Sequence, residues 1–268
     1  TSLEQLPKIK NKLSKKLKII VDGGVRSGSD IIKCLSLGAD YVAIGRPIIY
    51  GLIANSNIGV SRVLELFMNE LKISLRLCGF EKISDLSNKN IIKWHINSGT
   101  KGIIPCGTTG ESPTLSHEEH KLVVELALEY SDNQLTVIAG TGSNSTEEAI
   151  SFTKHAKSAG ANSALVVVPY YNKPSQMGLK EHYLKIADSS DLPLFIYNIP
   201  GRSVVDMNDD TIYELSLHEN IIGIKDATND LTRPIKLKKN ITHKKFFQLS
   251  GEDGTQLAYL AHGGDGVI

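Results

Sequence analysis

The stretch Ile221-Ile222-Gly223-Ile224-Lys225-Asp226-Ala227-Thr228 runs four apolar or small residues directly into a lysine. A short run rich in isoleucine is typical of a buried strand in a parallel sheet. Burial of Lys225 would disfavour its ammonium form and lower its pKa, so that a neutral amine could attack a carbonyl group. The alternative is that the strand ends at Ile224 and the Lys225 side chain reaches water.

The amino-acid composition limits the classes of protein to which the chain can belong. The chain has 268 residues, of which 41% are apolar, and a formal net charge of +1. This allows one large domain or two small ones with a sizeable core, and the charge gives no sign of nucleic-acid binding. No apolar run is long enough to span a membrane, and no signal peptide is expected. Cys34, Cys78 and Cys106 are odd in number and lack metal-ligand spacing, which favours a reduced, cytoplasmic protein without a metal site.

A strand–helix rhythm organises the second part of the chain. Short apolar runs begin near residues 102, 135, 164, 194, 221 and 246, about one βαβ unit apart. Two helix starts carry capping-box signals, Ser116 with Glu119 and Ser145 with Glu148. Short strands that are nearly all apolar are typical of parallel sheets covered by helices, so a (β/α)8 barrel or a doubly wound sheet is expected.

The first part of the chain carries the same two kinds of element. Strands are expected at 19–21 and 41–44, and helices at 29–37 and 58–78. The polar, irregular segment 79–90 is the best candidate for a boundary between the two parts.

Four predicted strand ends carry side chains suited to chemistry. They are 107–111 (GTTGE), 169–172 (PYYN), 197–202 (YNIPGR) and Lys225. Each alone fits a turn, a surface tyrosine pair or a lysine that reaches water. Both candidate folds place their sites at the carboxyl ends of strands. Hydroxyls, a guanidinium and an amine gathered at one end of one sheet therefore indicate an active site.

Residues 90–268 resemble the 4-hydroxy-tetrahydrodipicolinate synthase (dihydrodipicolinate synthase) family, pyruvate-dependent Schiff-base lyases built on a (β/α)8 barrel. The matching stretches are PCGTTGESPTLSHEEH (105–120), IAGTGSN (138–144), VPYYNKPSQMG (168–178), YNIPGR (197–202), GIKDAT (223–228) and LSGED (249–253). The resemblance implies condensation of pyruvate with aspartate semialdehyde in lysine biosynthesis, without a cofactor.

The resemblance also implies roles for the catalytic residues. Lys225 would form the imine with pyruvate, and Tyr197 would act as the general acid–base beside it. Thr109 and Tyr171 would complete a hydroxyl relay to solvent. In this family the tyrosine that matches Tyr171 reaches in from a neighbouring subunit, so a homo-oligomer is expected.

Other matched residues would bind the substrates. Thr108 and Thr109 would hold the pyruvate carboxylate. Arg202 would hold the carboxylate of aspartate semialdehyde through its bidentate fork. Ile268 would line the same site. N-acetylneuraminate lyases share the lysine and the Tyr-Asn-Ile-Pro turn but generally lack this arginine, which favours the synthase over the lyase.

A second set of matched residues implies feedback inhibition by lysine. These residues correspond to those that bind lysine in regulated members of the family: Ser112, His117, His120, Asn144, Glu148 and Tyr170. Glu148 could pair with an ammonium, and Asn144 and Tyr170 could hold a carboxylate by hydrogen bonds. The alternative is that Glu148 is only the partner in a capping box and that the histidines are only a polar helix face.

Residues 1–88 resemble the C-terminal end of FMN-dependent α-hydroxy-acid dehydrogenases. The matching stretches are VDGGVRSGSDIIKCLSLGADYVAIGRP (21–47) and GVSRVLELFMNELKISLRLCG (59–79). The positions that hold the FMN phosphate in that family correspond to Asp22, Gly24, Arg26, Gly45 and Arg46. That family's catalytic histidine lies upstream of anything present here, so flavin chemistry is not expected, although FMN binding stays open.

The chain is therefore interpreted as a hybrid of two barrel families, joined near residues 88–91. If 1–88 and 89–268 merge into one barrel, residues 41–44 should lie beside 102–105. Residues 19–21 should then displace the segment 266–268 from the strand at 246–249 and leave it frayed. Two alternatives to the synthase remain: a non-catalytic hybrid barrel and an FMN- or phosphate-binding protein.

Overall fold

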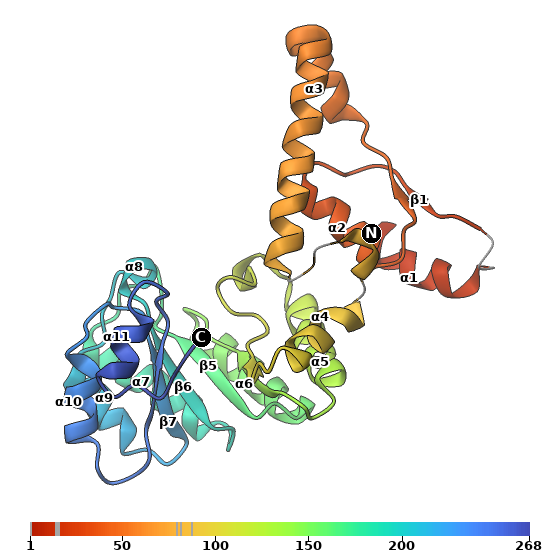
Figure 1. Ribbon diagram of the computed structural model, residues 1–268. Helices are drawn as coiled ribbons and strands as arrows, with labels where there is room; N and C mark the ends of the chain where they lie inside the picture. The colour runs from red at the N-terminus through yellow and green to blue at the C-terminus, as the bar shows by residue number, and fades with distance from the viewer. Residues whose placement is uncertain (1, 14–16, 79, 81, 87) are drawn as a thin grey trace. The chain divides into compact units, whose positions relative to one another are not determined.

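The computed structural model describes residues 2–13, 17–78, 80, 82–86 and 88–268. The chain divides into two compact units, residues 1–99 and residues 100–268 (Figure 1). Among the described residues, no helix is both long and apolar enough to cross a membrane.

The first unit is mainly helical, with a small parallel sheet in which Ile20 pairs with Tyr41. Its elements are α1 (Ser2–Lys12), β1 (Ile20–Val21), α2 (Gly28–Ser36), β2 (Tyr41–Val42), α3 (Arg46–Leu77), the short 3-10 helix η1 (Ile83–Asp85) and α4 (Asn88–Asn97). The helix α3 begins earlier than the predicted helix at 58–78 and is broken by non-helical backbone at Asn55 and Ser56. Leu6, Val25 and Phe67 belong to one buried hydrophobic cluster of this unit, and Ile32 and Leu71 belong to another.

The second unit is a curled sheet of seven parallel strands in sequence order, from β3 to β9 (Figure 1). Its strands are β3 (Gly102–Ile103), β4 (Thr136–Gly140), β5 (Ser163–Val167), β6 (Leu194–Asn198), β7 (Ile221–Asp226), β8 (Phe247–Ser250) and β9 (Gly266–Val267). The six predicted strand starts are confirmed to within one residue. A parallel sheet that follows the chain strand by strand fits a (β/α)8 barrel.

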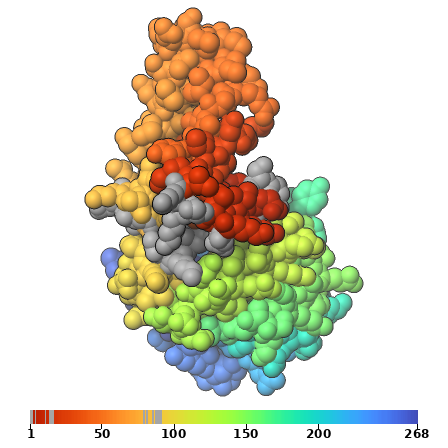
Figure 2. Space-filling model, turned by 90° about the vertical axis from the view of Figure 1, so that its right-hand side faces the viewer, coloured from red at the N-terminus to blue at the C-terminus, as the bar shows by residue number. Residues whose placement is uncertain are grey.

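Helices connect successive strands of this sheet and cover its outer face. They are η2 (Ser112–Thr114), α5 (His117–Ser131), α6 (Thr146–Ala159), α7 (Gln176–Asp188), α8 (Pro200–Ser203), α9 (Asp209–Ser216), α10 (Arg233–Asn240) and α11 (Gln256–Ala261). The predicted capping box at Ser116 is confirmed, with both reciprocal hydrogen bonds to Glu119. The helices α5 and α6 pack together and form a continuous yellow-green to green surface (Figure 2).

Side chains of the central strands alternate between two hydrophobic clusters. Leu194 and Ile196 of β6 belong to the main core between sheet and helices. Phe195 and Tyr197 instead join Leu165 in a smaller cluster on the inner face. Because successive side chains of a strand point to opposite faces, this alternation directs Tyr197 and the matching position of β7 into the interior of the curled sheet.

The prediction that residues 266–268 are displaced from the strand at 246–249 is wrong. Residues 266–267 pair with β8, and within the first unit residues 41–42 pair with β1. The segment 266–268 is thus an ordered strand with an extra hydrogen bond from the Ile268 N–H to the Ser250 carbonyl, 2.9 Å. Both pairings join strands that are separated by a single helix, so they close shorter loops than the predicted pairings would.

Candidate active site

Lys225 and Tyr197 meet at the carboxyl ends of neighbouring strands. The strand β7 continues through Lys225, so the alternative in which it ends at Ile224 is wrong. Lys225 pairs in register with Tyr197 of β6. Its Nζ atom lies 4.4 Å from the centroid of the Tyr197 ring, within the range of a cation–π contact. The amine and the phenol are therefore close enough to act on one small molecule.

The surroundings of Lys225 disfavour its charged form relative to water. Burial lowers the pKa of Lys225, and the negative charge of Asp253 opposes this effect. A lowered pKa enlarges the fraction of neutral amine, which is the nucleophilic form. Gly251 leaves room for the lysine side chain, because a methyl group at that position would lie 2.8 Å from the Lys225 Cε atom.

The phenol of Tyr197 is buried and stays protonated at neutral pH. Burial raises the pKa of Tyr197, whereas the neighbouring Thr108 side chain and the positive charge of Arg202 act in the opposite direction. A protonated phenol beside a neutral amine can give a proton to an oxygen atom and later take one back.

A cavity of about 200 Å³ opens beside Tyr197. Its polar lining includes Thr108, Ser112, Tyr170, Tyr197 and Arg202. The cavity is smaller than the pockets that hold drug-sized ligands and suits a small metabolite. Lys225 is not among its lining residues, but it contacts Tyr197, which is.

Besides Lys225, three predicted catalytic or substrate-binding residues do not line this cavity. Thr109 is exposed, Ile268 is 40% exposed at the end of β9, and Tyr171 is 88% exposed. Tyr171 also has a left-handed backbone, with φ of 70°, which is uncommon for a bulky residue. Among the described residues, no hydrogen bond links Thr109 or Tyr171 to Tyr197, so the predicted hydroxyl relay is not assembled within this single chain.

The six residues of the predicted lysine site fall into two groups. Ser112 and Tyr170 line the cavity beside Tyr197. On the helices, His117 Nε2 lies 2.6 Å from Glu148 Oε1, so the Glu148 carboxylate contacts a histidine. Ser145 caps α6 by accepting a hydrogen bond from the Glu148 N–H, but Glu148 does not return the bond that would complete a capping box.

His120 and Asn144 are the two remaining residues of the predicted lysine site. The His120 ring is buried and stacks on Phe152 with 4.0 Å between centroids. Burial lowers the pKa of His120. The Asn144 amide donates to Asn172 Oδ1 over 3.4 Å.

The predicted phosphate-binding residues of the first unit share a separate cavity of about 590 Å³. All five of them line it: Asp22, Gly24, Arg26, Gly45 and Arg46. Gly23 and Gly24 have φ angles of 93° and 79°, a backbone that glycine adopts without strain. Two arginines beside such a glycine turn fit a phosphate group.

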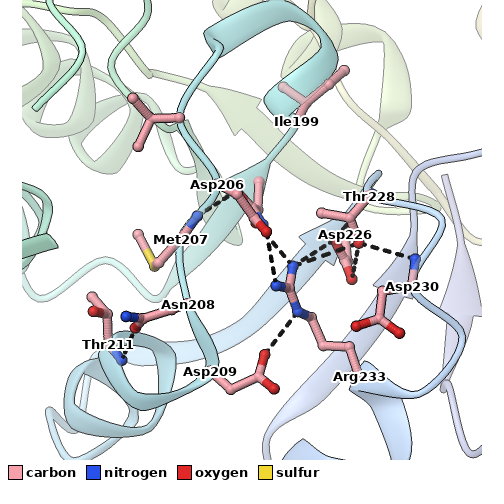
Figure 3. A network of polar contacts seen from close by, with 12 residues as sticks. Ile199, Asp206, Met207, Asn208, Asp209, Thr211, Asp226, Thr228, Asp230 and Arg233 are labelled. Carbon is pink, nitrogen blue, oxygen red and sulfur yellow. Dashed lines mark hydrogen bonds and ion pairs between the residues drawn. The ribbon is translucent and has the colours of Figure 1, made fainter. Parts of the chain in front are cut away.

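Sequence reasoning missed a partly buried ionic cluster that includes Asp226, the residue after Lys225 in β7. The guanidinium of Arg233 contacts the carboxylates of Asp206, Asp209 and Asp226 (Figure 3). A signal was present in the sequence, because Arg233 precedes Pro234 at the start of a helix. A cation is unfavourable at a helix N-terminus unless anions hold it there. Among the described residues, no group of side chains is arranged to hold a metal ion.

The chain is similar to named enzymes and to solved structures. A 4-hydroxy-tetrahydrodipicolinate synthase from Gluconacetobacter diazotrophicus is 51% identical over 195 residues, which are 73% of this chain and 63% of that protein. The structure of dihydrodipicolinate synthase from Acinetobacter baumannii complexed with pyruvate is 46% identical with a TM-score of 0.65, covering 68% of this chain and 62% of that one. The lysine-bound enzyme from Cyanidioschyzon merolae is 37% identical with a TM-score of 0.65, covering 68% and 61%.

The chain spans less than two thirds of the length of these relatives. The profile of the FMN-dependent dehydrogenases matches residues 1–93. The profile of the Dihydrodipicolinate synthetase family matches residues 80–268, well over half of the sequence. The chain therefore belongs to the dihydrodipicolinate synthetase family.

Proposed function

We propose that the second unit is a Schiff-base lyase that condenses pyruvate with aspartate semialdehyde, the reaction of a 4-hydroxy-tetrahydrodipicolinate synthase. The observation that carries this proposal is the contact between the partly buried Lys225 amine and the Tyr197 ring at the ends of two paired strands. Family membership and the named relatives support it.

The chemistry begins with the neutral amine of Lys225. Its nitrogen attacks the ketone carbon of pyruvate; the oxygen takes one proton from that nitrogen and one from the Tyr197 phenol and leaves as water, which gives a protonated imine. The imine withdraws electrons, so the pyruvate methyl group loses a proton to the Tyr197 phenolate and becomes the nucleophilic carbon of an enamine. That carbon attacks the aldehyde carbon of aspartate semialdehyde, and the aldehyde oxygen takes a proton back from the Tyr197 phenol. The amino group of the condensed product then attacks the imine carbon and displaces the Lys225 amine, which releases the product. No cofactor is required for these steps.

Two polar groups at the cavity suit the carboxylates of the substrates. The Thr108 hydroxyl lies beside Tyr197 and would hold the pyruvate carboxylate. The exposed guanidinium of Arg202 at the same cavity can hold the carboxylate of aspartate semialdehyde in a bidentate pair.

The proton relay would be completed by a second copy of the chain. Tyr171 has its ring in solvent in the single chain, which is the state expected of a side chain that a partner site receives. We therefore propose a homo-oligomer in which Tyr171 of one chain and Thr109 of the other carry protons between Tyr197 and solvent.

Lysine is proposed as an inhibitor that binds near His117, Asn144 and Glu148. The Glu148 carboxylate can pair with an ammonium group, and Tyr170 connects this region to the cavity beside Tyr197. Binding there would act on the relay directly, because Tyr170 adjoins Tyr171.

A substrate comparison tests the proposed reaction. Pyruvate consumption should depend on aspartate semialdehyde and should be lost in Lys225→Ala. Cleavage of N-acetylneuraminate to release pyruvate would instead favour the related aldolase. Failure of the folded wild type to consume pyruvate would favour a non-catalytic barrel.

The first unit has a second candidate function, which is binding of a phosphate group in the cavity lined by Arg26 and Arg46. We propose that these arginines supply the charge and that the turn at Gly23 and Gly24 supplies backbone N–H groups. Titration with inorganic phosphate should show binding that is weakened in Arg46→Ala but kept in Arg62→Ala, since Arg62 pairs with Glu65 on the surface. Equal binding by both variants, or none by the wild type, would contradict it.

A further inference from the structure

We infer that Arg233 is a positioning residue that holds Lys225 and Tyr197 in register through a ring of polar contacts on the opposite face of their strands. The inference rests on the proposed function only for its catalytic consequence. The ring itself is visible in the contacts of four residues: Asn198, Asp206, Arg233 and Asp226.

The ring begins and ends beside the reacting pair. Asn198 directly follows Tyr197, Asp226 directly follows Lys225, and these two residues pair in register across β6 and β7. Because side chains alternate along a strand, Asn198 and Asp226 face the helices where Tyr197 and Lys225 face the interior. Fixing the outer pair therefore fixes the backbone that carries the inner pair.

Hydrogen bonds close the ring through Asp206 and Arg233. Asn198 Nδ2 donates to Asp206 Oδ1 over 2.6 Å. Arg233 donates to both oxygens of Asp206, from Nη1 over 3.1 Å and from Nη2 over 3.2 Å. The same Nη1 lies 3.5 Å from Asp226 Oδ1. A bidentate fork of this kind fixes orientation as well as distance.

Further contacts tie the ring to the loops that follow each strand. Asn198 Oδ1 accepts a hydrogen bond from the Met207 N–H over 3.1 Å. The Thr228 hydroxyl donates to Asp226 Oδ2 over 3.1 Å, and the Thr228 N–H donates to Asp226 Oδ1 over 3.2 Å (Figure 3). The ring thus joins β6, β7 and the start of α10.

Burial makes the ring dependent on the charges of Asp226 and Arg233. Asn198 is fully buried, and Asp226 and Arg233 are 3% and 5% exposed, whereas the Asp206 side chain is half exposed. Burial raises the pKa of Asp226 to about 6, and the positive charge of Arg233 opposes this rise. Since an unpaired buried charge is costly, loss of one partner forces the others to move.

Asp209 provides a matched control. It accepts from Arg233 Nε over 2.8 Å, shorter than either contact of Arg233 with Asp206. It lies at the start of α9, and no described hydrogen bond links it to Asn198 or Asp226. Removing the Asp209 charge weakens one contact of Arg233 but leaves the contacts among Asn198, Asp206, Arg233 and Asp226 in place.

The test compares Asp206→Asn with Asp209→Asn. The first readout is the rate at which borohydride traps pyruvate on Lys225, measured at saturating pyruvate beside thermal unfolding. Asp206→Asn should trap about ten- to a hundredfold more slowly, because small displacements of a reacting group have effects of this size. In Asp209→Asn, borohydride should trap pyruvate at the wild-type rate, even if the melting temperature of this variant falls as much as that of Asp206→Asn.

A second readout does not depend on pyruvate. Acetic anhydride labels the neutral amine, and labelling of Lys225 relative to exposed Lys239 can be followed by peptide mass spectrometry at pH 8. Opening the ring admits water to Lys225, so its pKa should rise and its relative labelling should fall in Asp206→Asn only. If Asp206→Asn fails to fold, Arg233→Lys replaces it, because lysine keeps the charge but lacks the fork.

The possible results separate the two claims. Equal slowing in both variants, or slowing in neither, would show that the ring is merely structural and would overturn the inference. A wild-type protein that labels at Lys225 but is never trapped by pyruvate would contradict the proposed function, while the labelling comparison would still decide the role of the ring.

Discussion

The substitution Gly251→Ala tests how closely the fold fits around Lys225. A methyl group at position 251 would lie 2.8 Å from Lys225 Cε and 3.1 Å from Lys225 Cγ. Carbon atoms in favourable contact are about 3.5 Å apart or more, so Cε would have to move by about 0.7 Å. A side chain forced off its rotamer by such a shift costs about 0.5–1.5 kcal/mol.

The expected effect is on reactivity rather than on stability. The backbone of Gly251 lies outside the left-handed region, so alanine is conformationally acceptable there. Replacing glycine by alanine lowers the conformational entropy of the unfolded chain, which stabilises the folded state by about 0.4–1 kcal/mol and offsets much of the strain. The free energy of unfolding should therefore change by less than about 1 kcal/mol, whereas the rate of imine trapping should fall about tenfold or more.

The assay measures pyruvate-dependent trapping by borohydride and urea unfolding on the same preparations. Gly254→Ala is the matched control in the same loop, because a methyl group there would be 3.6 Å from its nearest neighbour, a Glu252 carboxylate oxygen. Wild-type trapping by Gly251→Ala, or equal slowing in both variants, would refute the reasoning.

Three further predictions concern other groups. Tyr197→Phe should keep the fold and pyruvate binding but slow turnover by about 10²–10⁴, as measured by steady-state kinetics, because it removes a proton-transfer group; an unchanged turnover rate would rule out that role. Burial lowers the pKa of His182 to about 4, so stability that is present above about pH 6.5 should be lost as the pH falls to 4, by up to about 3 kcal/mol. Urea unfolding should show this loss in the wild type and a flatter profile in His182→Gln; equal profiles would argue against it. Lysine should inhibit the wild type in a titration but should inhibit Glu148→Ala much more weakly, and equal inhibition of the two would exclude the proposed lysine site.

The strand rhythm of the second unit could be predicted because its signals are local. Each strand is a short apolar run, and Ser116 and Ser145 mark helix starts through residues only three positions away. The burial of Lys225 was one of two alternatives that the sequence left open, and the strand of the structure continues through this residue.

The features that could not be predicted depend on contacts between distant residues. Arg233 contacts Asp206 and Asp209, which lie more than twenty positions away in the sequence, and no local sequence pattern predicts these contacts. The pairing of β9 with β8 was not predicted, because a two-residue strand gives a weaker sequence signal than the segment 19–21, which was expected to pair there instead.

The central claim is that Lys225 is the residue that forms the imine. Peptide mapping after treatment with pyruvate and borohydride tests it most directly. The account predicts one modified peptide, containing Lys225 and heavier by pyruvic acid less one oxygen atom, and no such peptide in Lys225→Arg, because arginine stays protonated. A folded protein that shows no adduct, or an adduct spread over surface lysines and kept in Lys225→Arg, would contradict it.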